Sequence, residues 1–197
     1  PAITASTGMD ALCHAIECYT SKKGNPFSEM IALKAIRLIS RSIREAFKNG
    51  KNLDARHDML LGAFYGGMCI ATSSTTAVHA LAYPLGGKYR IAHGISNAIL
   101  LPYVMQFNAV GNEAKFRDIA EAMEIDIARL SDAEATQAFI ASLFAFNHDL
   151  EIPADLKRWN ITEADLETLV EGAAKVTRLL DNNPRPMNKD DIRAIYL

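Results

Sequence analysis

Apolar residues recur along most of the chain with the spacing of amphipathic helices. The clearest case lies on an otherwise charged segment, where the apolar positions are three, four or seven residues apart: Leu33, Ile36, Ile43 and Phe47. This period of about 3.6 residues predicts a helix. Asn49-Gly50 follows directly and is expected to end it, because glycine and asparagine favour helix C-termini.

Further helices are predicted on the same grounds. The first runs from residue 8 to a loop at residues 21–26, and the others cover residues 53–83 and 94–108. A break near residues 72–76 is expected within the predicted helix at residues 53–83. The sequence Pro84-Leu85-Gly86-Gly87 predicts a strong break after that helix. Pro102 predicts a kink or a boundary within the helix at residues 94–108.

The last third of the chain carries three capping-box patterns, in which a side chain that can cap a helix precedes an acidic residue by three positions. They lie at residues 131–134, 162–165 and 188–191. Each is expected to open a helix. Alternating strand patterns, repeats and low-complexity linkers are absent, so the fold class expected is all-α, a helical bundle formed by one domain over residues 1–197.

Composition narrows the possible functions. The 197 residues are 49% hydrophobic and 22% charged with a net charge of -2, which gives no electrostatic footprint for nucleic acid or an anionic membrane. No apolar run approaches the roughly 20 residues of a membrane span. The three cysteines are an odd number without repeated spacing and are expected to be reduced, as in a cytoplasmic protein. The chain opens at Pro1 without a leader, which suggests a part of a longer protein.

Candidate chemistry centres on one carboxylate and three imidazoles. Asp10 and His14 are four residues apart, so a helix projects both from one face, roughly 6 Å apart along its axis. His79 and His93 lie on either side of the predicted break, which can bring them together. Four such groups suit zinc, iron or nickel. The alternatives are an Asp–His hydrogen bond and unrelated histidines. His57 and His148 are expected at the surface.

Four segments match, in order, the motifs of a known family. They read GMDALCHAIE at residues 8–17, VHALAYPLG at 78–86, AHGISNAILLP at 92–102 and NNPRP at 182–186. They resemble the G-x-D-A-x-x-H-A-x-E, H-x-x-x-H-x-L-G, H-G-x-x-N-A-x-x-L-P and N-P-R-x patterns of the iron-containing alcohol dehydrogenases. The resemblance extends from one end of the chain to the other. It points to the metal-binding C-terminal domain of that family, which has the dehydroquinate synthase-like fold.

The resemblance implies a metal site and an activity. Asp10, His14, His79 and His93 would bind a divalent metal, usually iron(II) and in some members zinc. The family interconverts alcohols with aldehydes or ketones using NAD(H) or NADP(H), which lie mostly on an N-terminal α/β domain. Nothing here matches the glycine-rich phosphate loop of that domain. The chain is therefore expected to be the helical half only, without turnover by itself, and the complete enzyme is expected to be a homo-oligomer.

One position departs from the family pattern. Many members carry a second histidine four residues after the third ligand, often assigned to proton relay, and here that residue is Tyr83. On a helix Tyr83 shares a face with His79. Its hydroxyl either takes part in the relay or lines the substrate pocket. We favour pocket lining, because a phenol ordinarily titrates near pH 10 and relays protons poorly at neutral pH.

Two other functions compete with this prediction. A metal-dependent lyase of the dehydroquinate synthase type would share the broader fold, but such lyases bind zinc with one glutamate and two histidines. The motifs quoted above argue against this alternative. A non-catalytic helical module would use its histidines structurally. That alternative predicts no metal and leaves Tyr83 without a pocket.

Overall fold

The computed structural model describes all of residues 1–197, and it contains helices but no strands, as expected. The helices are α1 (Ala2–Thr20), α2 (Pro26–Lys48), α3 (Leu53–Ser73), α4 (Ala77–Tyr89), α5 (His93–Asn108), α6 (Glu113–Ala122), α7 (Asp132–Asp149), α8 (Leu166–Ala174), α9 (Thr177–Leu180) and α10 (Lys189–Tyr196), with 3-10 turns at Lys157–Trp159 and Glu163–Asp165. None of them combines the length and apolar character that crossing a membrane requires.

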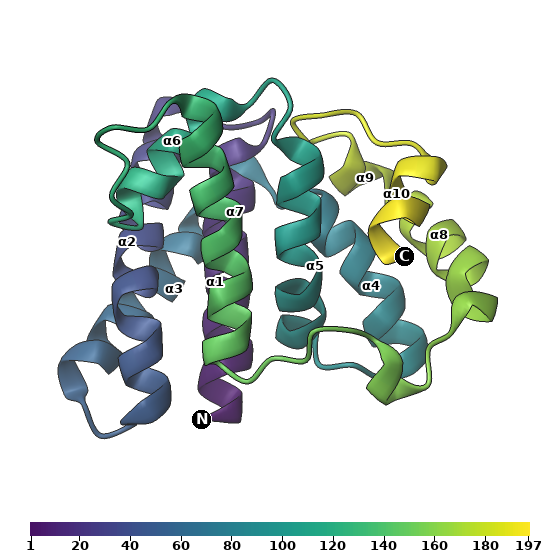
Figure 1. Ribbon diagram of the computed structural model, residues 1–197, viewed down its shortest axis with the longest axis horizontal. Coiled ribbons are helices and arrows are strands. Elements are labelled where there is room, and N and C mark those ends of the chain that lie inside the picture. Colours follow the sequence, from purple (N-terminus) through teal and green to yellow (C-terminus); the bar gives the residue numbers. More distant parts are fainter.

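Helix α1 lies in the middle of the molecule and contacts α2, α3 and α5. In Figure 1, α2 and α3 lie on one side of it, and α4 and the C-terminal helices lie on the other. Its buried face is built from small and aliphatic side chains such as Met9, Leu12 and Ile16. Because these residues leave no gap for water, the polar side chains on the same helix are held in fixed positions.

Several helix starts follow from local sequence. Side-chain capping boxes are formed at Asn25, Ser131, Thr162 and Asn188, which confirms the three predicted in the last third of the chain. The break near residues 72–76 is confirmed as well, since α3 ends at Ser73 and α4 begins at Ala77. Helix α1 begins at Ala2, earlier than the pattern predicted.

The prediction of a helix break at residues 84–87 is wrong. Helix α4 continues through Pro84 to Tyr89 and ends at Arg90, which adopts the left-handed conformation (φ 56°). Tertiary packing outweighs the local cost: Leu85 is fully buried, and a Cβ atom on Gly172 of α8 would lie 2.9 Å from the Pro84 ring. Helix α5 likewise continues through Pro102, so no boundary occurs there.

The position of His79 must be corrected for the same reason. It was expected late in a helix and separated from His93 by the proline–glycine segment. It lies instead in the first turn of α4, and the chain between α4 and α5 consists of residues 90–92 alone. His79 is therefore near the open N-terminus of its helix, where backbone N–H groups lack partners within the helix.

Candidate metal centre

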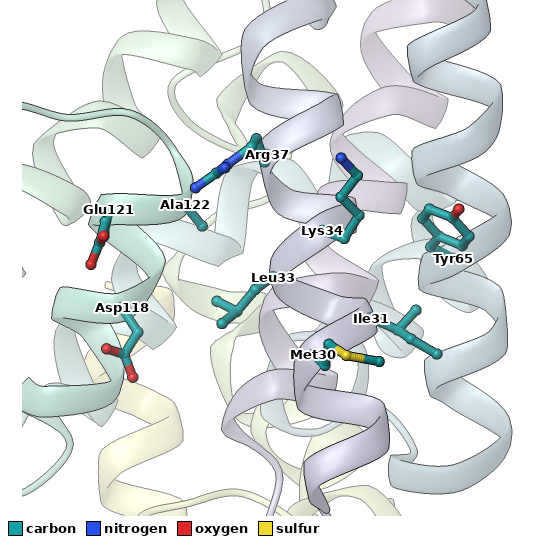
Figure 2. A pocket seen from close by; sticks show the side chains of 9 residues that line it. All are labelled: Met30, Ile31, Leu33, Lys34, Arg37, Tyr65, Asp118, Glu121 and Ala122. Carbon is teal, nitrogen blue, oxygen red and sulfur yellow. The ribbon is translucent and has the colours of Figure 1, made fainter.

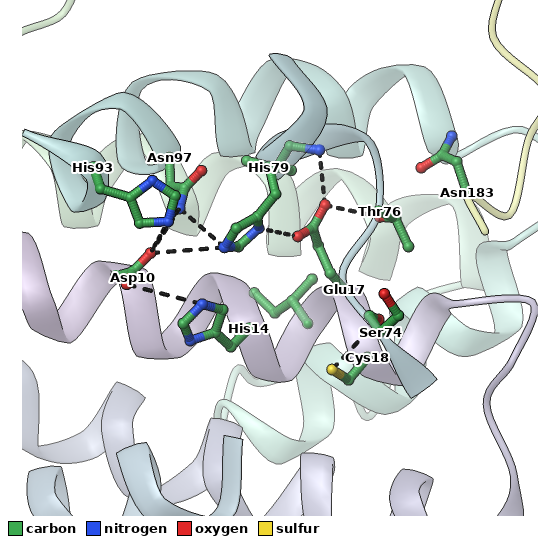
Figure 3. A network of polar contacts seen from close by, with 12 residues as sticks. Asp10, His14, Glu17, Cys18, Ser74, Thr76, His79, His93, Asn97 and Asn183 are labelled. Carbon is green, nitrogen blue, oxygen red and sulfur yellow. Dashed lines mark hydrogen bonds and ion pairs between the residues drawn. The ribbon is translucent and has the colours of Figure 1, made fainter. Parts of the chain in front are cut away.

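Three helices bring the predicted residues together. Asp10 and His14 come from α1, His79 from the first turn of α4, and His93 from the first position of α5. Figure 3 shows the four side chains facing one another across the space between these helices. One ligand atom from each lies within 4.8 Å of all the others. The structure thus brings all four residues together, a convergence that their spacing in the sequence could not establish.

The separations suit a small cation. Asp10 Oδ1 lies 3.5 Å from His93 Nε2 and 3.9 Å from His79 Nε2, and Asp10 Oδ2 lies 3.9 Å from His14 Nε2. Ligand atoms around a tetrahedral ion with bonds of about 2.1 Å are about 3.4 Å apart. Small side-chain movements are enough to reach that spacing. One carboxylate and three neutral imidazoles are a donor set that iron or zinc accepts.

The amide of Asn97, one turn into α5, provides a second test of the fit. Its Nδ2 lies 2.6 Å from Asp10 Oδ1, 3.1 Å from His93 Nε2 and 3.2 Å from His79 Nε2. An amide nitrogen carries two hydrogens and cannot donate to three acceptors. The Oδ1 atom of Asn97 is buried without a partner. Acceptor lone pairs therefore converge on one point with too few protons to satisfy them, which is what a cation-binding site requires.

Glu17 closes the inner side of the cluster. Its carboxylate is fully buried and accepts hydrogen bonds from the Thr76 hydroxyl (2.8 Å) and the Val78 backbone N–H (2.7 Å), and it makes a close contact with His79 Nδ1. Burial by itself raises the pKa of Glu17, but the charge and hydrogen bond of His79 hold that pKa below its ordinary value. Burial similarly opposes protonation of His79, and the carboxylate outweighs it, so the pKa of His79 is raised.

The outer side of the cluster is open. Asp10 and His14 are about one-fifth exposed and the His93 side chain is 48% exposed. Partial burial lowers the pKa of His14, which favours the neutral form that binds metals. The Tyr83 ring lies on this side, 6.2 Å from the His93 ring, and is itself partly exposed. A small molecule can therefore approach the cluster past Tyr83 and His93.

Two polar residues of this site, Glu17 and Asn97, were assigned no role from the sequence, although each occupies a fixed position of a family motif, the final E of the first and the N of the third. A signal for Glu17 was present, since it follows Asp10 by seven residues and His14 by three, and so shares their helix face. Asn97 follows His93 by four residues, again at helical spacing. In both cases the partner lies on another helix, and periodicity within one helix does not reveal it.

The other histidines and a separate apolar cavity lie elsewhere. His57 and His148 are strongly exposed, which confirms the surface positions expected for them. A cavity of about 600 Å³ lies between α2, α3 and α6. Figure 2 shows it lined by apolar side chains such as Met30 and Leu33, with charged groups at its edges. It contains no histidine, and none of the clustered carboxylate–imidazole groups line it.

Comparison with known proteins identifies the family of the chain. The model of the Fe-containing alcohol dehydrogenase family, C-terminal part, matches residues 4–197. The chain belongs to this family. The resemblance inferred from the four sequence motifs is thereby confirmed. The lyase alternative was expected to use one glutamate and two histidines, whereas this member of the family assembles one aspartate and three histidines.

Relatives in the Fe-containing alcohol dehydrogenase family cover the whole chain. Long-chain-alcohol dehydrogenase 1 of Geobacillus thermodenitrificans is 44% identical over 196 residues, and 1,3-propanediol dehydrogenase of Klebsiella pneumoniae is 42% identical over 195 residues. A crystal structure of 1,3-propanediol oxidoreductase superimposes with a TM-score of 0.96 at 42% identity, covering 100% of this chain and 51% of that one. The chain spans about half the length of the curated relatives it matches, 50% in both cases.

Proposed function

We propose that Asp10, His14, His79 and His93 hold a divalent metal, iron(II) or zinc(II), in an NAD(P)-dependent alcohol dehydrogenase that interconverts a small alcohol with an aldehyde or ketone. The observation that carries the proposal is the convergence of the four ligand atoms within 4.8 Å of one another. Membership of the family supplies the reaction class. The relatives described above, a long-chain-alcohol dehydrogenase and a 1,3-propanediol dehydrogenase, support alcohols as the substrate class.

The side chains of this chain bind and orient the reactants. When bound, the cation supplies positive charge that stabilises negative charge on an adjacent alcohol oxygen and polarises a carbonyl. Hydride exchange is the chemistry that the nicotinamide supplies. Asp10 offsets part of the cation's charge, and three neutral imidazoles leave the rest. Tyr83 and His93, on the open side, shape the approach of the substrate. The role favoured for Tyr83 is pocket lining, because a phenol relays protons poorly at neutral pH.

Elemental analysis of the purified chain tests the proposed site. The parent is expected to contain about one equivalent of iron or zinc after anaerobic reconstitution, and an Asp10→Ala, His79→Ala double variant almost none. A His57→Ala, His148→Ala variant is the matched control, because it removes two exposed histidines outside the cluster and keeps the full metal content. Equal metal in the parent and the first double variant would rule out the proposed site.

A second measurement concerns turnover. The 197-residue chain is expected to bind metal without nicotinamide-dependent turnover, because the family holds its cofactor mostly on an α/β domain and these residues form no strand. Oxidation of short alcohols by the chain with NAD or NADP, followed at 340 nm, would contradict this expectation. In the complete enzyme, Tyr83→Phe is expected to retain turnover if Tyr83 lines the pocket, and to lose most of it if the hydroxyl relays a proton.

A further inference from the structure

Glu17 is an ionisable residue that is fully buried, yet it is not one of the four proposed metal ligands. Both of its oxygens have partners. Oε1 accepts from the Thr76 hydroxyl and from the Val78 backbone N–H, and Oε2 faces His79 Nδ1 (Figure 3). Thr76 precedes α4 and makes no cap hydrogen bond to its own helix. The carboxylate on α1 therefore caps α4 from outside, where a helix N-terminus favours negative charge.

The two oxygens cannot exchange roles. The Val78 N–H can only donate, so the oxygen beside it must be an acceptor. The contact with His79 then belongs to the other oxygen, and an ionised carboxylate can only accept. His79 must consequently carry a proton on Nδ1. In the neutral imidazole, Nε2 is then the acceptor.

The free nitrogen of His79 points at the proposed metal centre. Nε2 lies 3.9 Å from Asp10 Oδ1 and 3.2 Å from Asn97 Nδ2. His79 is also the most buried of the three imidazoles in the cluster, so water cannot substitute for its Nδ1 partner. Carboxylates that accept from the second nitrogen of a histidine ligand fix its tautomer and ring orientation in many metal sites.

We propose that Glu17 is the positioning residue of this centre, which holds His79 in the Nδ1–H tautomer and directs its Nε2 lone pair to the point where Asp10 and His93 converge. The inference deepens the proposed function and rests on it. It concerns the state of one imidazole, and it can therefore be measured even before any metal is added.

Glu17→Gln is the decisive variant, because it keeps the shape of the side chain and leaves it one acceptor in place of two. The Val78 N–H claims that acceptor, so the amide NH₂ group faces His79 Nδ1. The imidazole must then accept at Nδ1 and carry its proton on Nε2, where a metal would bind. Metal affinity is expected to fall by about 10- to 100-fold, the usual effect of losing such a partner. Thr76→Val is the matched control, since it removes a donor from the far oxygen and leaves the Glu17–His79 contact in place.

Two-bond ¹H–¹⁵N spectra of the imidazoles in the metal-free chain at alkaline pH give the direct readout, and zinc titration against a competing chelator gives the affinity. We expect the Nδ1–H tautomer of His79 in the parent and in Thr76→Val, and the Nε2–H tautomer in Glu17→Gln. Circular dichroism checks that the variants are folded. Should Glu17→Gln fail to fold, the parent spectrum decides alone, because an Nε2–H tautomer there overturns the inference.

The outcomes separate this inference from the proposed function. An Nδ1–H tautomer in a parent chain that binds no zinc supports the role of Glu17 and removes the metal site. Zinc binding of equal affinity in the parent and in Glu17→Gln overturns the role of Glu17 and leaves the metal site standing. A loss of affinity without a change of tautomer also overturns it, since the variant would then act through general destabilisation.

Discussion

Helices α3 and α5 both pack on α1, but α5 is buried on most of its surface and α3 only along one narrow stripe. Helix α5 is buried along most of its length, including the run from Ser96 to Pro102. Helix α3 is longer and touches its neighbours along a stripe of mostly small residues, of which Gly62 and Gly66 are the centre. Its other faces carry exposed apolar side chains such as Leu60 and Phe64. Only α5 carries a member of the ligand cluster, His93, which lies half-exposed at the N-terminal end of the buried run.

The difference shows what a precise site requires of its scaffold. A ligand can be held to a fraction of an ångström only where the surrounding side chains leave it no alternative rotamer. The backbone of α5 beside His93 is fixed in this way, because it approaches α1 so closely that only a glycine fits at position 94. Helix α3 supports α1 from the other side without contributing a polar group to the site. Substitutions of the same kind should therefore have unequal effects in the two helices.

The largest effect is expected for Gly94→Ala in α5. A Cβ atom there would lie 2.1 Å from the backbone oxygen of Ser6 in α1. Relief of this clash must move α5 next to His93 or α1 one turn before Asp10. We expect destabilisation above about 4 kcal/mol, measured by urea unfolding, together with loss of metal binding. Gly67→Ala in α3 is the control, because its Cβ would meet nothing within 4 Å. That variant should gain up to about 1 kcal/mol from helix propensity. A stable Gly94→Ala chain would show that the close approach of α1 and α5 is absent.

Truncation of leucines should separate the two helices next. Leu101 in α5 is fully buried, so Leu101→Ala is expected to lower the free energy of unfolding by about 3 kcal/mol through lost contacts and a cavity. Leu60 in α3 is 74% exposed, and Leu60→Ala should change stability by less than about 0.5 kcal/mol. Both values come from the same denaturant titration. Equal losses would mean that the exposed face of α3 is covered in solution.

A smaller effect is expected at the glycine stripe of α3. A Cβ on Gly66 would lie 3.3 Å from the Ala11 carbonyl oxygen and 3.6 Å from His14 Cβ. The crowding is tight but moderate, and the gain in helix propensity partly offsets it. We expect Gly66→Ala to lose about 1 kcal/mol in thermal unfolding. Because the contact adjoins His14, zinc affinity should fall as well, whereas Gly67→Ala should leave it unchanged.

The smallest effect concerns the ion pair between α2 and α3. Asp58 accepts two hydrogen bonds from the Arg41 guanidinium and one from the Ser42 hydroxyl, and these hold its pKa below the ordinary value. A lowered folded-state pKa stabilises the protein above the unfolded pKa of about 4, and this stabilisation is lost as the pH falls through the folded-state value. Asp58→Asn should therefore cost at most about 1 kcal/mol at pH 7.

The pH dependence of that difference is the check. Parent and Asp58→Asn should converge in thermal unfolding midpoint as the pH falls well below 4, and Arg41→Gln should reproduce the behaviour because it removes the partner. A difference that persists unchanged in acid would assign the effect to packing of the Asp58 side chain instead of its charge.

Local sequence determined much of the fold. The capping boxes at Ser131, Thr162 and Asn188 formed where predicted, because a side chain three residues from its partner needs no tertiary contact to cap a helix. The all-helical class followed from the 3.6-residue period of the apolar positions. The pairing of Asp10 with His14 also followed from spacing along one helix.

Tertiary structure decided the remainder. Pro84 stays inside α4 because its ring packs against Gly172, a residue 88 positions away that no local pattern connects to it. His79 meets Asp10 because α4 begins where Glu17 of α1 accepts hydrogen bonds from the Val78 backbone N–H and the Thr76 hydroxyl. The residue types of the site are written in the sequence, but their convergence depends on contacts between α1, α4 and α5. Periodicity describes one helix at a time, and the energy that joins helices comes from surfaces that meet only in the folded chain.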